Sequence, residues 1–167
     1  MTLDELNAMD AGAFNTALAG IFEHSPWVAE AVVAQRPFAS VADLHAAMCA
    51  AVAAAEPPLQ MRLIRAHPQL AGKAAIRGEL TAASTSEQRG AGLDQCSAEE
   101  FGEITQLNSA YDQRFGFPFI LAVKGHTRGS IIVNMRERLA NARAGEIAEA
   151  LRQIGRIARF RLDALLS

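Results

Sequence analysis

The stretch EIAEALRQIGRIARFRLDALL, residues 146–166, decides the fold class because its apolar residues repeat with the period of an α-helix. At about 100° per residue, one arc of such a helix collects most of the apolar side chains. They are Ile147, Leu151, Ile154, Ile157, Ala158, Leu162 and Leu165. The pattern predicts a long helix that packs one face against a core.

Arg161 lies on this apolar arc, whereas Arg152, Arg156, Arg159 and Asp163 lie on the opposite side. A long arginine side chain can reach solvent from such a position. Alternatively, its guanidinium faces inward and needs an anionic or carbonyl partner, which a substrate could provide. The pattern leaves both possibilities open.

The rest of the chain favours the same class of fold, which we predict to be all-α. Of its 167 residues, 50% are hydrophobic and only 6% are aromatic, and this length suits one domain. We therefore expect a single domain, residues 1–167, built as a bundle of about seven to nine helices. Helix signals mark residues 10–22, 27–35, 40–52, 59–66, 97–115 and 130–141, in addition to the last stretch.

Residues 69–94 differ from the remainder because glycines and polar residues interrupt the helical pattern, so we expect an irregular, glycine-rich segment. Within it, Ser84 with Glu87, and Thr85 with Gln88, have the spacing of a capping box. A helix N-terminus flanked by hydroxyl groups also suits an oxygen-rich ligand. The spacing does not choose between the two roles.

A second unusual segment is FPFILAV, residues 117–123, a short apolar run opened by a proline. Its composition indicates buried core. The proline also favours an irregular backbone, which could leave N–H groups available to a ligand.

The segment RAHPQL, residues 65–70, holds the strongest catalytic candidate. Pro68 disfavours the helical conformation at His67, so the imidazole should leave the helix axis at a helix end. A histidine that merely ends a helix is the simpler interpretation. Together, however, His67, Glu87 and Arg161 supply an acid/base group, a carboxylate and a cation, which suffice for proton-coupled chemistry on a small polar substrate. We interpret His24, His45 and His126 as structural or solvated.

Composition and spacing also exclude several classes of function. The 16 basic and 18 acidic residues nearly cancel, which argues against nucleic-acid or membrane partners. Cys49 and Cys96 lack the spacing of a metal site. No apolar run approaches the roughly 20 residues of a membrane span, the N-terminus is unlike a signal peptide, and the C-terminus lacks a Ser-Lys-Leu address. We expect a cytoplasmic protein with a small-molecule substrate and no metal.

Several motifs in order resemble one family: HPQLAG at 67–72, Leu80-Thr81 with Ser84 and Glu87-Gln88, AGL at 91–93, Leu107-Asn108 with Tyr111, FGFPFI at 115–120, Arg138-Leu139, Glu146, Ile157 and Arg161-Leu162. The chain resembles the OHCU decarboxylases, which convert 2-oxo-4-hydroxy-4-carboxy-5-ureidoimidazoline to (S)-allantoin in urate breakdown. The resemblance covers nearly the whole chain, although residues 2–55 match mainly in helical pattern.

The resemblance implies a homodimer without metal or organic cofactor and assigns residues to the site. It makes His67 the catalytic acid and Glu87 and Arg161 the polar catalytic anchors. The substrate-lining residues would be Pro68, Ser84, Thr85, Ser86, Glu87, Gln88, Phe119, Ile120, Leu121, Ala122 and Val123. The alternatives are a lyase or hydrolase of another purine-derived ureide, and a non-catalytic helical ligand-binding module.

Overall fold

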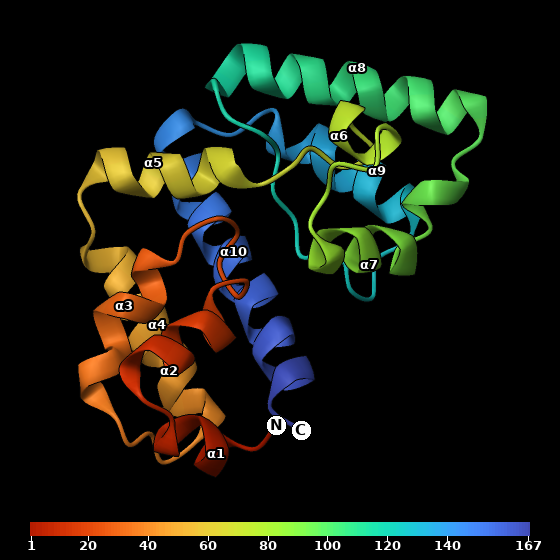
Figure 1. The fold of residues 1–167 in the computed structure, drawn as a ribbon. Coiled ribbons are helices and arrows are strands. Elements are labelled where there is room, and N and C mark those ends of the chain that lie inside the picture. The colour runs from red at the N-terminus through yellow and green to blue at the C-terminus, as the bar shows by residue number, and fades with distance from the viewer. The chain divides into compact units, whose positions relative to one another are not determined.

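The computed structural model describes residues 1–167, apart from the side chain of Ala74, and confirms the all-α prediction. Helices are the only regular elements among the described residues (Figure 1). The α-helices are α1 (Leu3–Ala8), α2 (Ala11–Leu18), α3 (Trp27–Val32), α4 (Val41–Ala54), α5 (Pro57–Ala66), α6 (Lys73–Ile76), α7 (Ala82–Gly90), α8 (Ala98–Phe115), α9 (Arg128–Arg138) and α10 (Arg143–Leu165); the 3-10 helices are η1 (Val33–Gln35) and η2 (Leu93–Gln95).

The chain divides into two compact units, which we describe separately. Unit 1 consists of Met1–Ala66 and Ile154–Ser167, and unit 2 consists of His67–Gln153. Helix α10 therefore contributes its first half to unit 2 and its second half to unit 1. None of the helices described in residues 1–167 combines the length and the apolar character that crossing a membrane requires.

Unit 1 forms around α3 and α4, which pack on each other. Ser40 caps α4 by accepting a hydrogen bond from the Asp43 N–H, as its sequence position predicts. The core of the unit includes Phe14, Leu18, Val28, Leu44 and Met48. Thus the helical periodicity of residues 40–52 is confirmed.

The first predicted helix, residues 10–22, is too long by one turn. Helix α2 ends at Leu18, and Ile21 and Phe22 are buried from the turn that follows. Because these two residues are buried without being helical, the apolar spacing alone predicts a helix end that lies too far along the chain. The pair Ser25-Pro26 predicts a cap for the helix that follows, but Ser25 does not cap α3, because its hydroxyl donates to the Glu23 carbonyl.

Unit 2 is organised by α8, which packs on α9. The spacing of Ser97 and Glu100 predicts a capping box, and helix α8 begins with it. It ends at Gly116, whose φ of 76° lies in the left-handed region that favours glycine. Both predicted boundaries of this helix are confirmed.

The segment predicted to be irregular, residues 69–94, contains α6, α7 and η2 joined by turns. Its predicted capping boxes are wrong, because Thr81 caps α7 by accepting a hydrogen bond from the Ser84 N–H at 3.2 Å. Ser84 is therefore already inside the helix. Similarly, α9 begins two residues before the predicted Ser130, because Thr127 caps it.

A buried carboxylate joins three helical segments at the core of unit 2. Glu146 is 0% exposed and accepts hydrogen bonds from the Tyr111 hydroxyl at 2.5 Å, Arg138 Nε at 2.8 Å and Asn141 Nδ2 at 3.0 Å. Burial, followed by the bond to Glu146, raises the pKa of Tyr111, so the phenol stays protonated and donates.

This cluster corrects two sequence predictions. The helical pattern of residues 130–141 places Arg138 on the solvated side, yet Arg138 is only 6% exposed because Glu146 neutralises it. In the first half of α10, the buried face consists of Glu146, Ala150 and Gln153, whereas Ile147 and Leu151 are only half-buried.

Replacement by alanine should change the stability of the protein in opposite directions at two glycines, one inside α8 and one at its end. Gly116→Ala places a side chain at φ 76° and should destabilise the protein by about 1 kcal/mol. Gly102→Ala, at an exposed helical position with open space around it, should stabilise it by about 0.5–1 kcal/mol. Urea unfolding measures both, and changes of the same sign would contradict these assignments.

The Glu146 cluster should be sensitive to loss of its charge. Glu146→Gln replaces one acceptor oxygen with a donor facing other donors and leaves Arg138 buried without its counter-ion, so we expect a loss of about 3–5 kcal/mol. Tyr111→Phe removes one hydrogen bond to the carboxylate and should cost about 1.5–3 kcal/mol. The free energies of unfolding in urea test this order; a Glu146→Gln variant as stable as Tyr111→Phe would refute it.

Candidate functional site

His67 lies where the sequence predicts, immediately after the last residue of α5, Ala66, and outside the helix. Its side chain is buried, with 7% exposure. An imidazole in such a position is surrounded by protein instead of bulk water.

The loop that follows His67 is held by two buried amide side chains. Gln88 of α7 accepts a hydrogen bond from the Ala71 N–H at 3.0 Å and donates to the Gln69 carbonyl at 3.3 Å. Asn108 of α8 donates to the Leu70 carbonyl at 2.9 Å. The backbone of residues 69–71 is therefore fixed from two helices.

The loop is also tightly folded at its end. A Cβ atom on Gly72 would lie 2.8 Å from Cβ of Gln69, closer than two such atoms can approach. Ala71 has a φ of 49°, a conformation that side chains other than glycine rarely adopt. The HPQLAG motif thus specifies one compact loop after His67.

The predicted substrate-lining residues 84–88 lie on α7, where they do not all point the same way. Ser84 and Gln88 are one turn apart and are both buried, at 4% and 6% exposure. Thr85 and Glu87 are half-buried, and Ser86 is exposed. Ser84 and Gln88 thus share the buried face of α7, and Ser86 lies away from it.

The other predicted lining segment, residues 119–123, is an irregular stretch between α8 and α9 and is wholly buried. The Ala122 N–H already donates to Oε1 of Gln153 in α10 at 3.0 Å. Arg138 of α9 donates to the Ile120 carbonyl. Among the described residues, no acceptor meets the N–H groups of Ile120 or Leu121.

Arg161 faces the interior of unit 1 and does not reach out to solvent, which decides between the two possibilities that the helical arc leaves open. It is 8% exposed, and its Nη1 lies 2.7 Å from a carboxylate oxygen of Glu23 and 3.0 Å from the Gly20 carbonyl. Both partners belong to the turns after α2. The sequence contains no signal for Glu23, because Glu23 directly follows the predicted helix of residues 10–22, which is itself too long.

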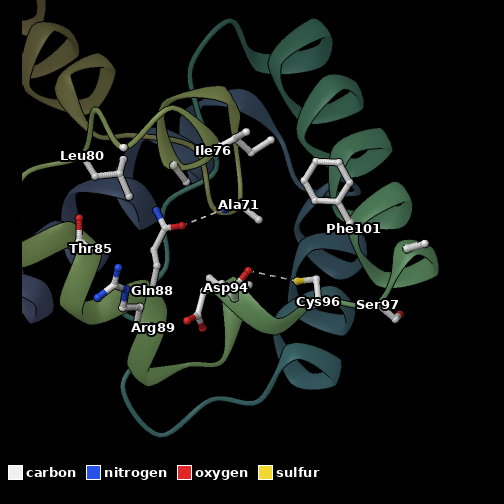
Figure 2. A pocket seen from close by; sticks show the side chains of 14 residues that line it. Ala71, Ile76, Leu80, Thr85, Gln88, Arg89, Asp94, Cys96, Ser97 and Phe101 are labelled. Atoms are coloured by element: carbon white, nitrogen blue, oxygen red, sulfur yellow. Dashed lines mark hydrogen bonds between the residues drawn. The ribbon is translucent and has the colours of Figure 1, made fainter.

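Unit 2 also contains a cavity of about 500 Å³ beside α7 (Figure 2). Ala71, Thr85 and Gln88 line it together with the exposed Ile76 and Phe101. His67, Glu87 and residues 119–123 are not among the residues that line this cavity. Gln88 therefore reaches from the cavity wall to the loop after His67.

The remaining histidines and cysteines have local partners or face solvent. His45 Nε2 lies 2.7 Å from the Gly155 carbonyl and 3.4 Å from Cys49 Sγ, His126 lies 3.0 Å from the Ser130 hydroxyl, and His24 is exposed. Burial, and then the Glu100 carboxylate, raise the pKa of the Cys96 thiol. The described side chains contain no group of three His, Cys, Asp or Glu residues suited to hold a metal ion.

Comparison with known proteins identifies the family. Residues 7–163 match the family described as OHCU decarboxylase. The chain is 41% identical over 162 residues to the 2-oxo-4-hydroxy-4-carboxy-5-ureidoimidazoline decarboxylase of Haloferax volcanii, covering 97% of this chain and 94% of that protein. It is also 44% identical over 166 residues to the uric acid degradation bifunctional protein PucL of Bacillus subtilis. That match covers 99% of this chain but only 33% of PucL.

Two solved structures share the fold. A crystal structure of (S)-allantoin synthase matches with a TM-score of 0.81 and 28% identity over 99% of this chain and 54% of that one. A crystal structure of OHCU decarboxylase in the presence of (S)-allantoin matches with a TM-score of 0.72 and 22% identity over 89% of this chain and 96% of that one. The chain therefore belongs to the OHCU decarboxylase family.

Proposed function

We propose that this protein decarboxylates 2-oxo-4-hydroxy-4-carboxy-5-ureidoimidazoline to (S)-allantoin in urate breakdown, without a cofactor. The observation that carries the proposal is the family match over residues 7–163, which includes His67 and its loop. The buried position of His67 and the fixed loop after it support a catalytic role for this side chain.

The proposed chemistry needs only a proton and correct orientation. When the bond to the leaving carboxylate breaks and CO2 departs, the electron pair moves into the adjacent ring carbonyl or imine. The hydroxyl on the carbon that lost CO2 gives up its proton and becomes a carbonyl, and His67 acts as the acid that protonates the neighbouring carbon, which bears the ureido group. Delivery of the proton from one face then gives the S configuration.

The other proposed roles belong to polar groups that orient the substrate. Glu87, half-buried on α7, would accept hydrogen bonds from the ureido N–H groups. The N–H groups of residues 120 and 121 would donate to ring oxygens. The Ala122 N–H is bonded to Gln153, so we leave it out of this role. Arg161 as a further substrate anchor stays a prediction from the resemblance.

The location and assembly of the protein are part of the same proposal. The resemblance favours a homodimer in the cytoplasm that acts on a small molecule. Sedimentation of the purified protein tests the dimer. A protein that sediments as a monomer at all concentrations would exclude it.

Circular dichroism tests the activity directly. Freshly generated substrate decays by itself to racemic allantoin, which has no dichroic signal, so enzyme should produce the signal of (S)-allantoin. Release of CO2 without ammonia or urea separates this reaction from that of a related ureide hydrolase or lyase. Substrate decay at the uncatalysed rate would instead support a non-catalytic binding module.

Removing the proposed acid should abolish most of the turnover. His67→Asn keeps a polar side chain but cannot deliver the proton, so we expect kcat to fall by about 10²–10⁴-fold. His126→Asn is the matched control, since the His126 imidazole meets the hydroxyl of the exposed Ser130 and its backbone bond to Val123 does not depend on the side chain, so this variant should retain full activity. Near-normal turnover of a folded His67→Asn protein would remove His67 from the mechanism.

Arg161 can be tested against a neighbour on the same helix. Arg161→Lys removes the guanidinium whose Nη1 meets both Glu23 and the Gly20 carbonyl, so we expect a large loss of kcat/KM with the helical fold retained. Arg159→Lys alters an exposed pair with Asp163 and should change activity little. Equal kcat/KM values for the two variants would reduce Arg161 to a structural role.

A further inference from the structure

Residues 119–123 form a buried segment without helix or strand, so their backbone groups need partners from elsewhere. Two side chains provide them at neighbouring peptide units. Arg138 donates to the carbonyl of Ile120, and Gln153 accepts from the N–H of Ala122 at 3.0 Å. Both side chains are almost inaccessible, at 6% and 3% exposure.

These two contacts fix the direction of the backbone groups of Leu121. The peptide bonds on either side of Leu121 are trans, so the C=O and N–H of each planar unit point in opposite directions. Because Arg138 holds the Ile120 oxygen, the Leu121 N–H points away from Arg138. Because Gln153 holds the Ala122 N–H, the Leu121 carbonyl points away from Gln153.

The backbone of Leu121 has no partner of its own among the described residues, although the residue is only 4% exposed. A buried N–H and a buried carbonyl without partners are costly, which points to a ligand that satisfies them. One donor and one acceptor on the same residue match a planar amide, which offers the reverse pair.

Each anchoring side chain is in turn held in one orientation. Nε2 of Gln153 donates to Glu149 at 2.8 Å, so its Oε1 must face Ala122. Hydrogen bonds from Arg152 and, less strongly, from Gln153 lower the pKa of Glu149 despite its partial burial. Arg138 is paired with Glu146 and stacks on Phe119, with 4.4 Å from its guanidinium carbon to the ring centre.

We propose that Arg138 and Gln153 are positioning residues, which present the N–H and C=O of Leu121 to the ring amide of the substrate. This inference rests on the proposed decarboxylase function and adds to it the residues that shape the substrate subsite. Neither side chain needs to touch the substrate. Their effect on the reaction passes through the backbone of residues 120–122.

Gln153 allows a test in which the contact is first removed and then restored. Gln153→Met keeps the length of the side chain but removes the acceptor for Ala122. We expect kcat/KM to fall about tenfold, mainly through KM, because a substrate-binding backbone loses its fixed direction. The double exchange Gln153→Glu with Glu149→Gln restores an acceptor toward Ala122 and a donor between the two side chains, and should recover most of the loss.

Amide hydrogen exchange measured by NMR provides a second readout, at Ala122 and Leu121. Gln153→Met should speed exchange of the Ala122 amide, and the double exchange should slow it again. In the unchanged protein, added (S)-allantoin should protect the Leu121 amide. A Leu121 amide that (S)-allantoin leaves unprotected would overturn the inference.

The control is a similar amide bridge in unit 1, where Asn7 donates to and accepts from the backbone of Phe38, both at 2.9 Å. Asn7→Leu should lower stability without raising KM. If Gln153→Met does not fold, Glu149→Ala provides a milder test, because Glu149 is partly exposed. Its removal leaves the Gln153 amide free to rotate and should raise KM severalfold.

The outcomes separate the two proposals. An unchanged protein that fails to accelerate decarboxylation contradicts the proposed function itself. An active protein whose KM is unaffected by folded Gln153→Met, or by Glu149→Ala, contradicts the positioning role alone.

Discussion

The buried carboxylate of Glu146 is the interaction on which unit 2 depends. It accepts from Tyr111 of α8, Arg138 of α9 and Asn141 after α9, while Glu146 itself belongs to α10. A charge removed from water is tolerated only when such partners surround it, so these segments must assemble together. Through Arg138 the same cluster reaches the carbonyl of Ile120, and the core thereby fixes a segment that the family resemblance assigns to the substrate.

Buried amide side chains likewise hold the backbone of the irregular segments that are proposed to form the site. An all-helical protein has no sheet ladder to satisfy the backbone of its loops, so side chains must supply the missing hydrogen bonds. Gln88 and Asn108 do this for the loop after His67, and Gln153 does it for Ala122. The irregular segments proposed to bind substrate are therefore rigid because helices hold them, which suits catalysis that relies on orientation.

The sequence predicted features that depend on neighbours along the chain. The caps at Ser40 and Ser97 and the helix end at Gly116 follow from local spacing and are confirmed. The spacing also places Arg161 on the inner arc of its helix, but only the structure shows that its guanidinium turns inward. The buried polar residues Glu146, Arg138 and Gln153 were missed, because their partners are distant in sequence and an apolar arc counts polar residues as exposed. Similarly, spacing could not show that Thr81, and not Ser84, begins α7. The resemblance, and not periodicity, assigned roles to residues 84–88 and 119–123.

A crystal structure of this protein with bound (S)-allantoin tests the account most directly. We expect the product to meet the Leu121 N–H and carbonyl with one of its amide groups, with His67 facing the carbon that bears the ureido group. Arg138 and Gln153 should keep their bonds to the backbone of residues 120 and 122. Allantoin bound elsewhere, or bound with Leu121 still unpartnered, would contradict the account.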